Sequence, residues 1–299
     1  MDNETLFLMS SDSLEDLKPL SKMLDLSGKV AVVTGTVGLA LFVINRLAEC
    51  GAKVVFGGRT EEWGRMAEET MKAKGYDVSY FKTDVRKVDE CFALTEFAEK
   101  TYGTVDIVVP AAATWGARAF VDMKEEEWDD IIDTDLKGQY FTVQAAVRSM
   151  IRGGKGGKVV TIASVAHRGD DMIKIAMMTN YNAAKAGVVG MTKGIAKELK
   201  QYGINVNCVA PGGMLTPGAM MNSVKSSALY GAEWDGDLNT YGIATPMSTT
   251  PDEVALMIVT MCTDVSNFMY GQLIEVDGGS QFSFQEKPWS YTMEGGKHA

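Results

Sequence analysis

A serine, a tyrosine and a lysine in the middle of the chain have types and spacing that could transfer a proton. Tyr181 and Lys185 are four residues apart, so on a helix both side chains would project from one face. A tyrosine phenol ionises at a pH of about 10, and a nearby ammonium favours the phenolate, which suits acid–base work. Ser164, at the end of an apolar run, could hold a carbonyl or hydroxyl oxygen beside that phenol. A Tyr-x-x-x-Lys pair is also common by chance, so this interpretation depends on the surrounding elements.

The composition favours a soluble globular protein that binds a small molecule. The chain has 299 residues, of which 46% are hydrophobic, so it is long enough to bury a substantial core. Its formal net charge is -10, whereas nucleic acids and anionic membranes select basic surfaces. Neither nucleic acid nor membrane is therefore expected as a partner.

The cysteines and the apolar runs indicate where the protein works. Four scattered cysteines and two histidines show no metal-ligand spacing, so neither a metal site nor a disulfide framework is predicted. No apolar run approaches the length of about 18 residues that a membrane span needs. A cytoplasmic protein with reduced thiols is the expectation. The cysteines are Cys50, Cys91, Cys208 and Cys262.

A glycine-rich turn near the N-terminus has the order of elements that a phosphate site requires. An apolar run over 29–34 precedes the turn, a helical segment ending near residue 50 follows it, and 53–56 reads as a second strand. Glycines let backbone N–H groups approach a pyrophosphate, and the positive end of the helix faces it. Glycine-rich turns are frequent, so the strand–helix–strand context carries the prediction. The turn residues are Gly35, Thr36, Gly38 and Leu39.

The end of the second strand bears on the choice between NAD and NADP. A carboxylate at this place accepts a hydrogen bond from the ribose 2′-OH of NAD and repels the 2′-phosphate of NADP. Here the residues are Gly57, Gly58 and Arg59, and the guanidinium could pair with a phosphate. The pattern leans toward NADP, although Arg59 could instead be solvated or lie over the adenine.

Helical and strand segments continue to alternate along the chain. This alternation predicts one doubly wound parallel sheet, Rossmann-like, with helices on both faces and ligands at the carboxyl ends of the strands. Ser164 follows the fifth strand, so it lies at the correct edge. The expected helices are 61–74, 87–102, 125–150, 180–201 and 251–262, and the further strands are 78–82, 105–109, 158–163, 204–209 and 272–276.

Segments at both ends of the chain are expected to lie outside this regular pattern. Residues 1–27 form an N-terminal extension in which leucines at roughly helical spacing predict a helix over 13–25, packed on the domain, across a subunit contact, or disordered. The Rossmann-like domain covers 28–280, and 281–299 form a C-terminal tail.

Taken together, these residues resemble the short-chain dehydrogenase/reductase family over about 26–280. The matching elements are Thr34-Gly35, Asp84-Val85, Ala163-Ser164-Val165-Ala166, Tyr181 with Lys185, Asn207-Cys208-Val209-Ala210-Pro211-Gly212 and Val276-Asp277-Gly278-Gly279. Within the family the chain looks most like the bacterial hydroxysteroid dehydrogenases, in particular the 20β type with its N-terminal extension.

The resemblance implies an NAD(P)(H)-dependent oxidoreductase that interconverts a secondary alcohol and a ketone. Tyr181 would be the general acid, Lys185 would lower the pKa of its phenol and bind the nicotinamide ribose, and Ser164 would orient the substrate oxygen. The family also implies a homo-oligomer, commonly a tetramer. The implied cofactor-binding residues are Gly35, Thr36, Gly38, Leu39, Arg59, Asp84, Val85, Ala111, Ala112, Tyr181, Lys185, Pro211, Gly212 and Thr216.

Three positions depart from the family pattern. The glycine turn is one residue shorter and ends in Ala40, so its phosphate contacts must differ in detail. Residues 110–113 read Pro-Ala-Ala-Ala where the family has Asn-Asn-Ala-Gly, which removes side-chain amides. Asp135 stands where a helix asparagine completes the family's proton relay. Either the relay uses a water and a backbone carbonyl, or Asp135 is structural.

The segments expected to surround the substrate are rich in methionine and aromatic residues. The interval from Ser164 to Tyr181 is longer than usual in the family, and 214–250 corresponds to the family's variable substrate lid. Such a lining suggests a large apolar carbonyl or alcohol, in first place a steroid. The alternatives are a 3-oxoacyl reductase, for which an acidic carrier protein would be a poor electrostatic partner, and a nucleotide-sensing or scaffolding relative without catalysis. The candidate substrate residues are Met172, Met177, Met220, Tyr230 and Trp234.

Overall fold

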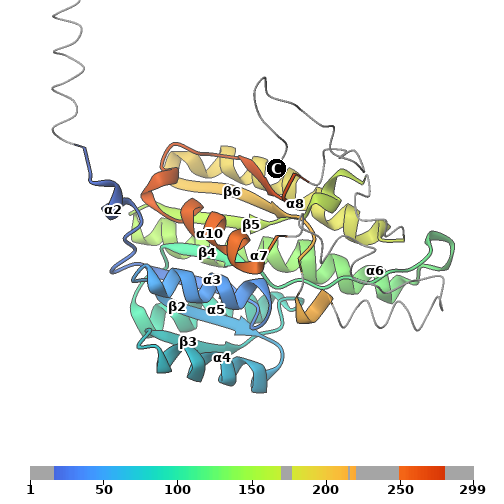
Figure 1. The fold of residues 1–299 in the computed structure, drawn as a ribbon, viewed down its shortest axis with the longest axis horizontal. Coiled ribbons are helices and arrows are strands. Elements are labelled where there is room, and N and C mark those ends of the chain that lie inside the picture. The colour runs from blue at the N-terminus through green and yellow to red at the C-terminus, as the bar shows by residue number, and fades with distance from the viewer. Residues whose placement is uncertain (1–16, 170–176, 215, 220–248, 280–299) are drawn as a thin grey trace, which may run out of the picture.

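Seven parallel strands form one sheet in the order β3-β2-β1-β4-β5-β6-β7 (Figure 1). The computed structural model describes residues 17–169, 177–214, 216–219 and 249–279. The order reverses between β1 and β4, which is where open α/β sheets place their ligands. The strands are β1 (Val30–Thr34), β2 (Lys53–Gly58), β3 (Val78–Lys82), β4 (Ile107–Pro110), β5 (Gly157–Ile162), β6 (Ile204–Pro211) and β7 (Leu273–Val276).

Helices cover both faces of this sheet, as a parallel sheet requires. On β1, Ala31 and Val33 belong to one buried cluster with α3, α4 and α10, whereas Val32 between them belongs to a second cluster with α5, α7 and α8. The Rossmann-like fold class predicted from the sequence is confirmed. The covering helices are α3 (Leu39–Glu49), α4 (Glu61–Ala73), α5 (Val88–Tyr102), α7 (Gly138–Gly153), α8 (Thr179–Leu199) and α10 (Pro251–Met261). Short 3₁₀ turns follow at η1 (Phe120–Asp122), η3 (Val165–Arg168), η4 (Lys200–Tyr202) and η6 (Asp264–Ser266).

The single helix expected over 125–150 is divided in three. An α-helix, α6 (Glu125–Ile132), leads into a π-helical turn, η2 (Asp133–Lys137), and α7 continues from it. A π turn widens the helix by one residue, and such turns occur frequently at functional sites. The apolar periodicity on both sides is uninterrupted, so the sequence does not mark the turn.

The N-terminal segment differs from the helix expected over 13–25. Within 17–25 only α2 (Leu20–Met23) is helical, and Pro19 stands at its N-cap. Leu17 and Leu20 are exposed, so in the described part these leucines do not pack on the domain. An ion pair of Lys18 with Asp264 connects the segment to the 3₁₀ turn η6, which follows α10. Residues 1–16 and the tail from 280 lie outside the described residues. In the part of the chain that the structure describes, no helix is long and apolar enough to cross a membrane.

Gln139, at the start of α7, joins the π turn to the carboxyl end of β5. Its Nε2 donates to the carbonyl oxygens of Ile162, at 2.8 Å, and of Asp135, at 3.0 Å, while its Oε1 accepts from Ile162 N–H at 3.1 Å. The amide is fully buried. Because every one of its bonds lies away from water, its loss leaves backbone groups unsatisfied.

We predict that Gln139→Leu lowers the free energy of unfolding by about 2–3 kcal/mol, because the buried N–H of Ile162 loses its acceptor. The check is the midpoint of urea unfolding at fixed protein concentration. Gln201→Leu is the matched control, since the Gln201 amide donates only to a nearby carbonyl at the exposed surface. Equal midpoints for the two variants would contradict the role assigned to Gln139.

Candidate active site

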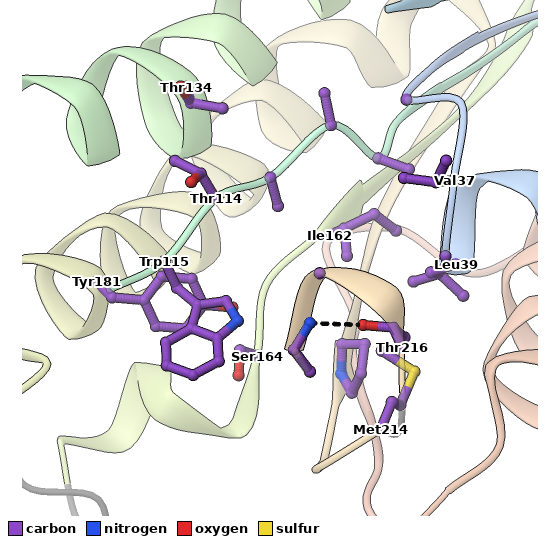
Figure 2. Close-up of a pocket in the computed structure, with 18 of the residues that line it drawn as sticks. Val37, Leu39, Thr114, Trp115, Thr134, Ile162, Ser164, Tyr181, Met214 and Thr216 are labelled. Atoms are coloured by element: carbon purple, nitrogen blue, oxygen red, sulfur yellow. Dashed lines mark hydrogen bonds between the residues drawn. The ribbon is translucent and has the colours of Figure 1, made fainter. Parts of the chain in front are cut away.

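One large cavity opens at the carboxyl ends of the strands, on both sides of the point where the strand order reverses. Its volume is about 800 Å³. Loops that follow β1, β2, β3, β4, β5 and β6 line it, together with the first turns of α3 and α8 (Figure 2). The cavity therefore brings together the glycine turn, the segment after β4 and the Tyr181 helix, as the sequence predicts.

The Tyr181 phenol and the Ser164 hydroxyl lie at the same end of this cavity (Figure 2). Ser164 caps the turn η3, where its Oγ accepts from Ala166 N–H at 3.2 Å. Glu275 on β7 anchors that turn, since it accepts from Arg168 at 2.9 and 2.7 Å and pairs with His167 at 2.9 Å. The Ser164 hydroxyl also acts on the Tyr181 phenol, whose pKa it lowers. A proton donor and an oxygen-orienting hydroxyl thus face the same space.

The first turn of α8 is held so that Tyr181 enters the cavity. Asn180 is buried, its Oδ1 accepts from Tyr181 N–H at 2.9 Å, and its Nδ2 donates to Glu127 O on α6 at 3.2 Å. This fixes the helix against α6 at the residue next to the phenol.

Lys185 is almost completely buried beneath Tyr181. Its Nζ donates to the carbonyl oxygen of Ile162 at 3.1 Å and lies 5.3 Å from the centroid of the Tyr181 ring. The same Nζ lies 2.9 Å from Oδ1 of Asp135, which is fully buried. That contact has the geometry of an ion pair and not of an aligned hydrogen bond. The other oxygen of Asp135 accepts from Thr114 N–H at 2.8 Å.

The electrostatics of this group differ from the sequence expectation. Burial raises the pKa of the Tyr181 phenol; the Lys185 ammonium opposes this rise, and the Asp135 carboxylate adds to it. Burial would lower the pKa of the Lys185 ammonium, but the neighbouring Asp135 carboxylate outweighs it and the pKa is raised. Burial also raises the pKa of the Asp135 carboxyl, against the pull of Lys185 and of the Thr114 N–H. Lys185 therefore acts on the phenol pKa in the expected direction, while burial and the Asp135 carboxylate act against it.

The floor of the cavity at the glycine turn is built for close backbone approach. Gly35 has a φ of 104°, and a Cβ placed there would lie 2.6 Å from the Cβ of Ala40. Helix α3 begins directly after Gly38, so its first N–H groups have no carbonyl partner within the helix. Ala112 N–H donates to Thr34 Oγ1 at 3.1 Å, which holds the alanine segment after β4 against the turn. These features fit a dinucleotide pyrophosphate.

The end of the cavity that is predicted to take the adenosine lies beside β2. A Cβ on Gly58 would come 2.6 Å from the Thr36 methyl group, so no side chain fits there. Arg59 is exposed at the cavity wall and, among the residues that the structure describes, forms no ion pair. Asp84 and Val85 line the wall nearby, and Arg86 binds the Asp84 carboxylate at 2.6 Å.

The opposite wall follows β6. Gly212 N–H donates to Val276 O at 2.9 Å, and Thr216 Oγ1 accepts from Ala219 N–H at 3.1 Å (Figure 2). Met214 and Thr249 form a bridge, which brings together the two ends of the segment expected to be the substrate lid. Residues 220–248 lie outside the described residues.

Every residue predicted to be catalytic or to bind cofactor lies at or directly behind this cavity. Among the predicted substrate residues, Met177 has a φ of 74°, and its carbonyl accepts from Arg118 N–H at 2.8 Å, so it holds a loop and is absent from the cavity lining. The predicted residues Met172, Met220, Tyr230 and Trp234 lie outside the described residues.

Two tryptophans at the cavity went unnoticed in the sequence. Trp115 lies at the same end as Tyr181 and Ser164 (Figure 2), and Trp63, on α4, also lines the cavity. Trp115 comes five residues after the fourth strand, in a loop, and this place at the carboxyl edge was the available signal.

Among the described residues, no group of three or more His, Cys, Asp or Glu side chains could hold a metal ion, and all four cysteines are free.

Comparisons with known proteins agree with this geometry. The family model described as short chain dehydrogenase matches residues 29–227. The 3-oxoacyl-[acyl-carrier-protein] reductase of Chlamydia muridarum is 35% identical over 260 residues, which cover 85% of this chain and 98% of that protein. A short-chain type dehydrogenase/reductase from Mycobacterium marinum has a TM-score of 0.76 at 30% identity, covering 87% of this chain and 98% of its own. A single-substitution variant of actinorhodin polyketide ketoreductase, solved with NADPH, has a TM-score of 0.77 at 30% identity and covers 84% of this chain and 97% of its own. The chain therefore belongs to the short-chain dehydrogenase family and is an NAD(P)-dependent oxidoreductase that acts on CH–OH groups.

Proposed function

We propose that the protein reduces a ketone on a bulky apolar substrate to a secondary alcohol, and catalyses the reverse oxidation. The observation that carries this proposal is the placement of Tyr181 and Ser164 in the same cavity as the glycine turn. A bound nicotinamide cofactor would supply the hydride to the carbonyl carbon. Ser164 holds the carbonyl oxygen, and Tyr181 donates its proton to that oxygen as negative charge develops. Lys185 lies behind the phenol, where its charge compensates the phenolate that remains.

We predict that Tyr181→Phe lowers kcat for ketone reduction by about 1000-fold or more, because the substrate oxygen loses its proton donor. Cofactor binding, followed by quenching of protein fluorescence, should change little. Tyr202→Phe is the control, since that phenol is half exposed at the end of α8, remote from the cavity lining. If the protein were a sensor or scaffold without catalysis, neither the wild type nor the variant would turn over a ketone. If kcat were unchanged in Tyr181→Phe, Tyr181 would not be the proton donor.

NADP(H) is the proposed preference between the two cofactors. The close contact of Gly58 with Thr36 leaves no room for a carboxylate at the end of β2. The exposed Arg59 guanidinium stands at the wall, where a ribose 2′-phosphate could be paired. The NADPH in the structure of the related ketoreductase supports the same choice.

Arg59→Ala should raise the KM for NADPH by about 10-fold, the effect of losing one hydrogen-bonded charge pair, and leave the KM for NADH nearly unchanged. Steady-state kinetics with both cofactors measures this. Arg152→Ala is a matched control, because Arg152 pairs with Glu99 on the outer surface. Equal changes in both KM values would show that Arg59 does not read the phosphate.

The first candidate substrate is a 3-oxoacyl thioester. Curated relatives at 32–35% identity, from Chlamydia, Staphylococcus aureus and Thermotoga maritima, are named 3-oxoacyl-[acyl-carrier-protein] reductases. They favour this substrate class over the steroid expected first from the sequence. The net charge of -10 opposes an acidic carrier protein, so a thioester on a small carrier is the form we favour.

A steroid ketone is kept as a second candidate because of Trp115. Its indole lies at the same end of the cavity as Tyr181 and Ser164 (Figure 2), where a rigid polycyclic substrate could pack on an aromatic face. An extended acyl chain offers no such face. The 20β-hydroxysteroid class stays a prediction.

Trp115→Ala should raise the KM of the true bulky substrate by about 10-fold, the effect of losing roughly 1.5 kcal/mol of apolar contact, while Trp115→Phe changes it much less. Acetoacetyl and longer 3-oxoacyl thioesters and a panel of steroid ketones are assayed with NADPH. Turnover of steroids alone would overturn the first candidate, and turnover of thioesters alone would overturn the second.

The homotetramer expected from the family stays a prediction, as does the cytoplasmic location. Helix α8 presents Ala183, Ala186 and Gly190 at its exposed side, where a second copy could approach closely. Gly187, expected to share that role, packs inward instead, because a Cβ there would lie 2.9 Å from the Leu136 side chain.

A further inference from the structure

The buried carboxylate of Asp135 contacts the lysine of the site directly, in a place where the family has a neutral amide. It lies in the π turn η2, and neither of its side-chain oxygens reaches solvent. One oxygen is 2.9 Å from Lys185 Nζ and the other accepts from Thr114 N–H at 2.8 Å. A charge so completely removed from water persists only with an opposite charge beside it.

The backbone of Asp135 is engaged separately. Its carbonyl oxygen accepts from the buried Gln139 amide at 3.0 Å, and that amide is locked by two bonds to Ile162. A proton relay through this carbonyl oxygen would have to share it with Gln139. The contact of Asp135 with the site therefore runs through its carboxylate.

Among the described residues, the charges that face Tyr181 and Lys185 come from few elements. Asp135 on η2 is closest to the ammonium, and Cys208 on β6 is a buried thiol that also acts on it. Asp130 on α6 acts on Asp135 from farther away, and Arg86 pairs with Asp130 at 2.8 Å. Ser164, which lies at the same end of the cavity as the phenol, carries no charge. Within the described part of the chain, Lys185 and Asp135 are therefore the two opposite charges that act on the phenol.

An ion pair has a much weaker field than an isolated ammonium at the same distance, because its two contributions have opposite signs. We propose that Asp135 is a positioning residue that holds the Lys185 ammonium and balances its charge, so that Tyr181 remains a neutral phenol through the neutral pH range. The inference rests on the proposed function of Tyr181 as proton donor. It means that the donor of ketone reduction keeps its proton to a higher pH than an unbalanced lysine would allow.

Asp135→Asn tests this directly, because it removes the charge and keeps an oxygen that can accept from Thr114 N–H. We expect ionisation of Tyr181 to move down by about one to two pH units in the variant. Ionisation of Tyr181 is followed by the ultraviolet absorbance of tyrosinate, without cofactor or substrate. The titration curve of the double variant Asp135→Asn/Tyr181→Phe is subtracted, so that the signal of this one phenol remains. In the pH profile of kcat/KM for ketone reduction, the fall at alkaline pH should begin correspondingly earlier.

Asp133→Asn is the matched control. Asp133 lies in the same π turn but pairs with Lys137 at 3.0 Å near the surface, so ionisation of Tyr181 should match that of the wild type. Asp135→Ser repeats the charge removal with a smaller side chain if Asp135→Asn does not fold, as judged by circular dichroism.

An unchanged or raised ionisation pH in the folded Asp135 variants would overturn the proposal. A merely structural role of Asp135 would lower kcat at all pH values without moving the titration. Because the absorbance titration needs no turnover, failure of the proposed function would appear separately, as an active Tyr181→Phe enzyme.

Discussion

The ion pair of Lys185 with Asp135 is the interaction on which the architecture of the site depends. It joins α8 to the π turn η2, and through the Ile162 carbonyl it reaches the end of β5. Removing two charges from water is costly, and the cost is offset only where close geometry and further hydrogen bonds satisfy both groups. Thr114 N–H and Ile162 O supply those bonds, so three separate segments must be in place before the lysine is stable in its position.

The alternation of strands and helices could be predicted because neighbouring residues in the sequence determine it. Each strand is a short apolar run with turn residues behind it, and each predicted strand agrees with the observed one to within a few residues. Ser164, Tyr181 and Lys185 could also be placed, since parallel strands bring their carboxyl ends to one edge. The π turn could not be predicted, because no local residue marks it and the partner of Asp135, Lys185, lies fifty residues farther along the chain.

The direction of the Tyr181 pKa illustrates the same limit. A helix with Tyr181 and Lys185 four residues apart predicts an attraction, and that attraction exists. Burial and the Asp135 carboxylate raise the pKa of the phenol by more than this attraction lowers it. Neither of them is contained in the local sequence pattern. The direction of the Trp115 side chain could not be predicted for a related reason, because loops have no periodicity that indicates where a side chain points.

The contact between Gly58 and Thr36 has a consequence for how this protein could change. A carboxylate at position 58 would introduce a Cβ 2.6 Å from the Thr36 methyl group, in a turn that must also stay close to the cofactor. The residues that position 58 can accept are thus set jointly by two segments. An acidic residue at 58 therefore requires a smaller residue at 36, and the order of the two substitutions decides whether the intermediate carries this clash.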